Sequence, residues 1–128
     1  MEERANGFEI RYDETRNILT LRIHQLLNTD LGHQCEKLFA EHVTGLSAQK
    51  QTWCLLLDIR CCPPQSQDIQ DVFGRMLNLA RQQGMQKHAL LVNRSITSVN
   101  RQLSTILPVS FYFQSEDAAL NWLNEELT

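Results

Sequence analysis

Three residues near the middle of this 128-residue chain, Asp58, Arg60 and Ser66, have types and spacing that could do chemistry. Asp58 and Arg60 close an apolar run that begins at residue 52, and Ser66 begins an amphipathic run. A phosphate on Ser66 would add about two negative charges at a helix N-terminus, where backbone amides stabilise anions. Asp58 and Arg60 could bind a partner or orient the loop that follows them. The alternatives are structural, with Ser66 as a plain helix cap, Asp58 as an acceptor for loop amides and Arg60 as a solvated charge.

The same loop carries two adjacent thiols, Cys61 and Cys62. Thiols near a helix N-terminus can react as nucleophiles, but adjacent cysteines rarely close a comfortable ring and no base is paired with them. Ordinary loop and core thiols are the alternative. The other cysteines, Cys35 and Cys54, fall inside helix and strand patterns, where a free cysteine acts as a small hydrophobe. No C-x-x-C pair occurs and the four histidines have no ligand spacing, so the sequence predicts neither a metal site nor a cofactor.

A second polar segment follows the next apolar run and opens a further helix pattern. It contains two arginines and three hydroxyl side chains, namely Arg94, Ser95, Thr97, Ser98 and Arg101. A helix N-terminus with two arginines can hold an anion or an acidic partner, and capping with solvated charge is the alternative. In open α/β sheets, ligands meet the fold at the carboxyl ends of the strands. We therefore predict a partner or ligand edge formed by this segment with Asp58, Arg60, Cys61 and Cys62.

Known catalytic arrangements are missing from the sequence. It contains no paired carboxylates placed for general acid and base work, no Ser/His/Asp set and no glycine-rich phosphate loop. The single acid at the end of the central strand lacks the second group that acid–base catalysis needs. We therefore expect a protein that is not an enzyme.

The length and net charge of the chain limit its domain number and the kinds of partner it can bind. A chain of 128 residues forms one domain, here residues 1–128, and buries enough surface for a core without disulfides. The net charge of -3, with acids and bases interspersed, argues against a nucleic-acid partner, which needs a basic face. No apolar run has the length of a membrane span, and the polar, acidic N-terminal residues are unlike a secretory signal. With reduced thiols, these features predict a cytoplasmic protein.

Hydrophobic periodicity predicts the order of strands and helices. Alternation over 8–13 and 18–24 predicts an antiparallel hairpin with one wet face. The near-continuous apolar run 52–59 predicts a central strand flanked on both sides, and further strands are expected over 87–93 and 109–113. Helical spacing predicts four helices, one capped by Thr29 or Asp30, one running from Ser66 to Gly84, one over 96–106 and one capped by Ser115.

These elements predict a single α/β domain with a mixed, mostly parallel sheet of about five strands. The N-terminal hairpin is antiparallel, and the alternation of strands and helices implies parallel pairing with right-handed crossovers. We expect the four helices mainly on one face, because the hairpin has a polar face. An exposed hairpin edge or an uncovered sheet face would favour a homodimer.

This order resembles the SpoIIAA-like superfamily, the fold of the STAS domains. Three segments carry the resemblance: YDETRNILTL at 12–21, LLLDIR at 55–60 leading through a loop into a helix, and FQSEDAALNWL at 113–123. The last segment is similar to the closing signature of STAS-like bacterial proteins of unknown function. The resemblance spans nearly the whole chain and rests mostly on structural motifs, so it implies the fold more directly than the function.

The resemblance also implies two kinds of function. Members of the antagonist branch bind a partner kinase or anti-sigma factor and are switched by phosphorylating a serine in an Asp-Ser-Ser-Gly-type motif. The matching place here reads PPQSQD at 63–68, which keeps a hydroxyl at Ser66 but lacks the preceding acid and the following glycine. A related branch shares its fold with the CRAL-TRIO lipid carriers. We therefore expect a regulatory module that binds a protein partner at the predicted edge, or alternatively a carrier or sensor of a small apolar or anionic ligand.

Overall fold

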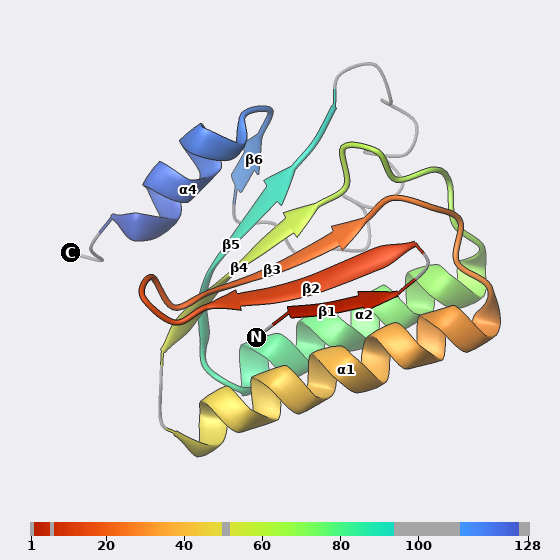
Figure 1. The fold of residues 1–128 in the computed structure, drawn as a ribbon, viewed down its shortest axis with the longest axis horizontal. Coiled ribbons are helices and arrows are strands. Elements are labelled where there is room, and N and C mark those ends of the chain that lie inside the picture. Colours follow the sequence, from red (N-terminus) through yellow and green to blue (C-terminus); the bar gives the residue numbers. More distant parts are fainter. Residues whose placement is uncertain (1, 6, 50–51, 94–110, 126–128) are drawn as a thin grey trace.

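A mixed sheet lies between two long helices on one face and a shorter helix on the other (Figure 1). The computed structural model describes residues 2–5, 7–49, 52–93 and 111–125. In this part of the chain six strands form one sheet, and their order across it is their order along the sequence. The strands are β1 (Glu2–Ala5), β2 (Phe8–Asp13), β3 (Ile18–Ile23), β4 (Trp53–Asp58), β5 (Met85–Leu91) and β6 (Phe111–Phe113).

The pairing follows the predicted pattern with one additional strand. β2 and β3 form the expected antiparallel hairpin, and β4 has a parallel neighbour on each side. The sheet has six strands rather than about five because β1 pairs antiparallel with β2 at the edge. The sequence signal for β1 is the Asn-Gly dipeptide at 6–7, which is favoured in tight hairpin turns. Gly7 has a φ of 99°, in the left-handed region that glycine adopts without strain.

Three helices lie within the described residues: α1 (Thr29–Ala48), α2 (Gln67–Gln82) and α4 (Glu116–Asn124). Ser66 and Ser115 are the N-cap residues of α2 and α4. The predicted cap of α1 was wrong by one or two positions, because the Asn28 side chain accepts a hydrogen bond from the Leu31 amide (2.8 Å). Asparagine is as good an N-cap as serine or aspartate, so the motif Asn-Thr-Asp offers three adjacent candidates. The helix predicted over 96–106 lies outside the described residues.

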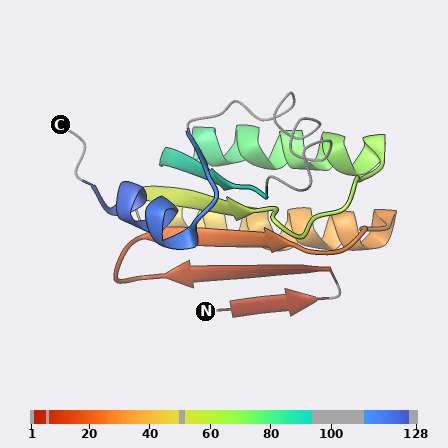
Figure 2. The ribbon, with the colours of Figure 1, turned by 90° about the horizontal axis from the view of Figure 1, so that it is seen from above.

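The two faces of the sheet are covered by different helices (Figure 2). Leu55 and Leu57 of β4 pack in the core that α1 and α2 close, whereas Cys54 and Leu56 pack against α4. The expected placement of helices mainly on one face holds for α1 and α2, but α4 lies on the opposite face. β4 is buried at every position, so an apolar strand of this kind needs a cover on both sides.

The carboxyl ends of the parallel strands β3, β4 and β5 meet at one edge of the sheet, which we call the carboxyl edge. In the parallel register Arg22 lies beside Asp58, and Asp58 lies beside Leu91. The Ile59 amide continues this pairing by donating to the Leu91 carbonyl (3.0 Å). The loops over 24–28 and 59–66 leave the sheet here, so the topology brings segments distant in sequence to the place predicted for a site.

Candidate functional site

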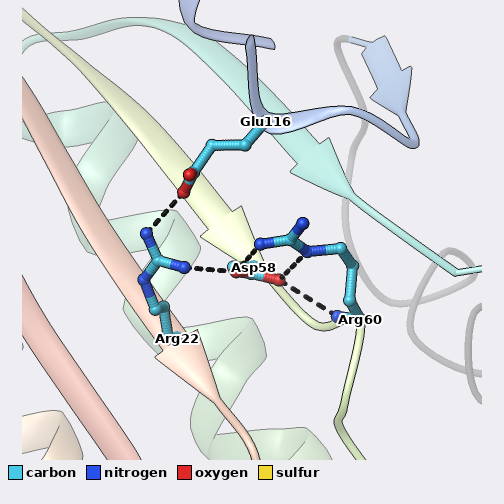
Figure 3. Close-up of polar contacts among 4 residues, drawn as sticks. All are labelled: Arg22, Asp58, Arg60 and Glu116. Atoms are coloured by element: carbon cyan, nitrogen blue, oxygen red, sulfur yellow. Dashed lines mark hydrogen bonds and ion pairs between the residues drawn. The ribbon is translucent and has the colours of Figure 1, made fainter. Parts of the chain in front are cut away.

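Asp58 lies at the centre of the carboxyl edge, between two arginines (Figure 3). Arg22 Nη1 donates to Asp58 Oδ2 (2.8 Å), and Arg60 donates to both carboxylate oxygens through Nε (3.1 Å) and Nη2 (2.9 Å). The Arg60 backbone amide adds a fourth hydrogen bond to Oδ1 (3.1 Å). The Asp58 side chain is only 8% exposed, so the two guanidinium groups compensate a carboxylate that the sheet removes from water.

Glu116, the first residue of α4, extends this network from the opposite side. Its Oε1 accepts a hydrogen bond from Arg22 Nη2, so Arg22 bridges Asp58 and Glu116. We call the four residues Arg22, Asp58, Arg60 and Glu116 the edge cluster. Its two guanidinium groups and two carboxylates balance in formal charge. The hydrogen bonds to Asp58 raise the pKa of the Arg60 guanidinium above its ordinary value, so Arg60 stays charged at any physiological pH.

An open pocket of about 340 Å³ lies against the edge cluster. Three strand ends and the loop after β4 contribute its lining, which consists of Arg22, Ile23, His24, Asp58, Arg60, Cys61 and Asn93. Most of these side chains are polar or charged, and the pocket opens to solvent at the end of the sheet. The structure therefore brings Asp58, Arg60 and Cys61 together, as the topology predicted, and adds Arg22 and His24 from β3 and its loop.

Gln65 joins the two loops at this edge. Its Oε1 accepts from the Leu27 amide (2.9 Å) and its Nε2 donates to the Gln25 carbonyl (2.9 Å). These bonds hold the backbone on both sides of Leu26, whose side chain is 63% exposed. Leu26 is the large hydrophobic residue that the described part of the chain leaves in solvent. The buried Gln65 side chain thus orders the backbone that carries an exposed apolar residue at the carboxyl edge.

The remaining predicted site residues separate into distinct environments. Cys62 is buried, and Gln65 Nε2 lies 3.5 Å from its sulfur, so it belongs to the core, whereas Cys61 is exposed. Burial raises the pKa of the Cys62 thiol, which makes it a poor nucleophile. Ser66 is exposed, and its hydroxyl oxygen accepts from the Ile69 amide (3.3 Å) as the cap of α2. The predicted residues Arg94, Ser95, Thr97, Ser98 and Arg101 lie outside the described residues.

The sequence interpretation missed several residues at this edge, among them Arg22, Leu26, Gln65 and Glu116. Arg22 stands on the wet face of the predicted hairpin, but its position beside Asp58 depends on the parallel register of β3 and β4. Glu116 directly follows Ser115, the predicted cap of the last helix, yet its contact with Arg22 requires that helix to cross the opposite face of the sheet. A single sequence does not specify register or helix placement, whereas an apolar residue in a polar loop was visible at Leu26.

Two other cavities help to decide what the protein can hold. One of them, about 510 Å³, lies between the β2–β3 turn and the C-terminal half of α1, and its lining includes Tyr12, Glu14, Glu41 and Gly45. An apolar space bounded by core residues such as Leu57, Phe73 and Met76 measures only about 10 Å³. That space holds at most one water molecule.

Two kinds of feature are absent from the part of the chain that the structure describes. No group of three or more histidine, cysteine, aspartate or glutamate side chains there could hold a metal ion. Among the same residues, no helix combines the length and the apolar character needed to cross a membrane.

Comparison with known proteins identifies the fold. No protein-family model and no curated protein matches the chain. Among solved structures, the chain is similar to an uncharacterised DUF3478-family protein with a SpoIIAA-like fold from Shewanella loihica PV-4, with 18% identity, a TM-score of 0.65 and 91% of each chain covered. It is also similar to the anti-sigma factor antagonist SpoIIAA in its unphosphorylated form, with 18% identity, a TM-score of 0.59, and 91% of this chain and 96% of that one covered. The chain therefore has the SpoIIAA-like fold that its sequence indicated.

Proposed function

We propose that this protein is a regulatory interaction module that binds a protein partner at its carboxyl edge and is not an enzyme. The observation that carries this proposal is Leu26, an exposed apolar residue whose flanking backbone is held by two hydrogen bonds to the Gln65 side chain, one accepted and one donated. The fold adds support, because a solved structure that shares it is an anti-sigma factor antagonist, a protein whose name describes action on another protein.

A fixed apolar residue suits partner binding for an entropic reason. Scattered exposed leucines are common on protein surfaces and need no explanation by themselves. Leu26 differs because the loop that carries it is already ordered, so a partner burying it would lose less conformational entropy on binding. His24, which lines the polar pocket at the carboxyl edge, precedes Leu26 by two residues in the loop after β3, so we place a polar rim next to the apolar contact.

The edge cluster is better arranged for recognition than for catalysis. Asp58 accepts four hydrogen bonds, from Arg22 Nη1 and from the amide, Nε and Nη2 of Arg60. These four donors engage the lone pairs of both carboxylate oxygens, whereas general base catalysis needs a group with an acceptor within hydrogen-bond reach of the substrate proton. The cluster supplies fixed charge and shape, which are the requirements for selecting a partner.

The alternative of an apolar carrier has less support. A ligand pocket usually measures roughly 300 Å³ or more and is lined mostly by apolar side chains. The apolar space beneath α1 and α2 is about 10 Å³, so a lipid could enter the described core only if the helices moved apart. The pocket at the carboxyl edge has a suitable volume, but it is open to solvent and five of its seven lining residues carry polar or charged groups.

A capture experiment with two matched variants tests the proposal. The full chain, its Leu26→Asp variant and a Thr44→Asp control on exposed α1 would each be immobilised and incubated with a lysate of the producing organism. Proteins held by wild type and by the control, but lost from Leu26→Asp, would be identified and purified, and their Kd measured by calorimetry. We expect Leu26→Asp to weaken that Kd at least about tenfold, the effect of removing an interface anchor.

Two results would overturn the proposal. One is equal binding of every captured protein to all three chains, which would exclude the carboxyl edge as the interface. The other is that the captured protein is a second copy of this chain, held equally by the Leu26→Asp variant, which would indicate homodimerisation through another surface. Circular dichroism of the variants would confirm that each one is folded before binding is compared.

A further inference from the structure

We infer that the carboxyl edge recognises a carboxylate on its partner and that Arg60 is the residue that binds this carboxylate. Glu116 competes with the partner's carboxylate for the guanidinium of Arg22. This inference rests on the proposed function, because it names the chemistry of the partner segment that would lie beside Leu26. That segment is acidic, carrying an aspartate or glutamate next to an apolar residue.

Arg60 is held in a fixed orientation with one side unused. Its Nε and Nη2 donate to the two oxygens of Asp58, which sets the plane of the guanidinium. Among the described residues its Nη1 has no hydrogen-bond acceptor, and the side chain is 33% exposed in the wall of the pocket. An oriented guanidinium with free N–H donors is a suitable partner for a carboxylate, and little further ordering is needed on binding.

Arg22 is placed differently, although it lines the same pocket. Its Nη1 donates to Asp58 and its Nη2 to Glu116, so both ends of the guanidinium already have acceptors. Glu116 therefore occupies the position that an incoming anion would take on Arg22. Because Glu116 and Arg22 are each about one-third exposed, water and a partner can compete for this pair.

The balance of charge favours a carboxylate over a doubly charged phosphate. The pocket is lined by two arginines and one aspartate, which gives a formal charge of +1 with His24 neutral. Glu116 neutralises Arg22 from outside the pocket, so the field available to a ligand is modest. A single negative charge on the ligand balances the formal charge of the pocket, whereas a phosphate dianion would leave excess negative charge beside Asp58.

An NMR titration with a simple probe tests the inference without the natural partner. Capped hexaglutamate would be added to the full chain labelled with ¹⁵N-arginine, with capped hexaglutamine as the neutral control. We expect the Arg60 Nε–H signal to shift with hexaglutamate and not with hexaglutamine, and the shift to diminish as salt is added.

Arg60→Gln should abolish the binding of hexaglutamate. Arg75→Gln is the matched control, because Arg75 also donates two hydrogen bonds to one carboxylate, that of Glu36, at another place on the surface.

The role of Glu116 has its own matched pair. Glu116→Gln should raise the affinity for hexaglutamate about threefold, the effect expected for one exposed charge. The glutamine oxygen can still accept from Arg22, but the negative charge that opposes an incoming carboxylate is removed. Asp117→Asn removes the same charge from the same first turn of α4, yet no contact joins Asp117 to Arg22 in the described residues. The Asp117 variant should therefore change the affinity less than the Glu116 variant does.

Three outcomes would overturn the inference: equal affinity of Arg60→Gln and Arg75→Gln for hexaglutamate, no difference between the two α4 variants, or tighter binding of inorganic phosphate than of hexaglutamate.

Failure of this inference is distinguishable from failure of the proposed function. If Arg60→Gln retains the partner that Leu26→Asp loses, the partner interface stands and the carboxylate assignment fails. If hexaglutamate binds as expected while Leu26→Asp loses no partner, the carboxylate site stands and the proposed interface fails.

Discussion

The ammonium group of Lys87 lies over the indole ring of Trp122, with Nζ 4.9 Å from the ring centroid, and donates to the Trp122 carbonyl oxygen (2.8 Å). Nζ also donates to the Glu125 carbonyl (2.8 Å), so one lysine from β5 caps the C-terminal end of α4. A cation is favoured at this end of a helix by the helix dipole, and the ring face adds an attraction of the cation–π type. Lys87 thus joins α4 to the sheet on the face away from α1 and α2.

Replacing Lys87 with methionine should destabilise the fold by about 1–3 kcal/mol. The methionine keeps most of the apolar stem, but both carbonyl oxygens lose a charged donor in a partly buried place. Urea unfolding followed by circular dichroism would measure the loss. Lys37→Met, which changes an exposed lysine on α1, is the control and should alter the free energy of unfolding by less than about 0.5 kcal/mol. Equal stability of the two variants would show that the Lys87 cap contributes nothing measurable.

Most of the described strands and helices were predictable because they have strong local signals. β4 is a continuous apolar run, α2 has a serine cap and a terminal glycine, and β2 and β3 alternate cleanly. The additional strand β1 was missed because its four residues include three charged ones, which do not resemble a strand in isolation. Position in space was harder to predict than element type. α4 has an ordinary amphipathic pattern, and that pattern does not say which face of a sheet it covers.

The candidate site was predictable as a place rather than as a set of contacts. Asp58 and Arg60 were expected at the carboxyl edge because they follow a parallel strand, and they pair there. Arg22 and Glu116 join them only through the register of β3 against β4 and through the position of α4, both of which depend on tertiary packing. Gln65 had no signal at all, since a glutamine in a loop is usually exposed and this one is buried.

Gln65→Ala should both lower stability and loosen the loop that carries Leu26. The substitution leaves the Leu27 amide and the Gln25 carbonyl without their side-chain partner, at an expected cost of about 2 kcal/mol. Hydrogen exchange of the Leu27 amide should become faster than global unfolding allows, because that bond fixes the loop. Gln67→Ala, an exposed neighbour that donates to Asp71, is the control. Unchanged exchange at Leu27 in the Gln65 variant would mean that the loop is ordered by other contacts.

Cys35 should make the stability of the protein decrease at alkaline pH. Burial raises the pKa of this thiol from 9.0 to about 12, so the folded state keeps its proton at pH values where the unfolded state has released it. The contribution is complete below pH 9 and is lost as pH rises towards 12, with a slope approaching about 1.4 kcal/mol per pH unit. Urea unfolding at several pH values above 8.5 would show the slope. Cys35→Ala should unfold with a shallower pH dependence, because the buried thiols of Cys54 and Cys62 remain in both proteins.

If the slopes of wild type and Cys35→Ala are the same, ionisation of Cys35 in the unfolded state does not control alkaline stability. The absolute stability of the variant does not enter this test, since removing a buried sulfur also costs packing energy at every pH. Only the difference in slope between the two proteins reports on the thiol proton.

Ser66 can be separated into a cap and a switch by two substitutions. Ser66→Ala removes the acceptor for the Ile69 amide and should cost about 1 kcal/mol. Ser66→Asp keeps an acceptor and places a negative charge at the N-terminus of α2, where the helix dipole favours it, so stability should stay within about 0.5 kcal/mol of wild type. If modification of Ser66 regulates the partner, the aspartate should change the Kd of the captured protein while the alanine leaves it nearly unchanged.

Ser115 is the matched control for this comparison, because its hydroxyl caps α4 with the same 3.3 Å bond, to the Ala118 amide. Ser115→Asp and Ser115→Ala should repeat the stability pattern of the Ser66 pair, and they serve as controls for stability because Ser115 adjoins Glu116 of the edge cluster. If Ser66→Asp and Ser115→Asp change the partner affinity equally, the cause is a negative charge near a helix end and is not specific to position 66. If wild type and Ser66→Asp bind the partner with the same Kd, Ser66 acts only as a helix cap. A charge at the start of α2 would then have no effect on a partner bound at the carboxyl edge.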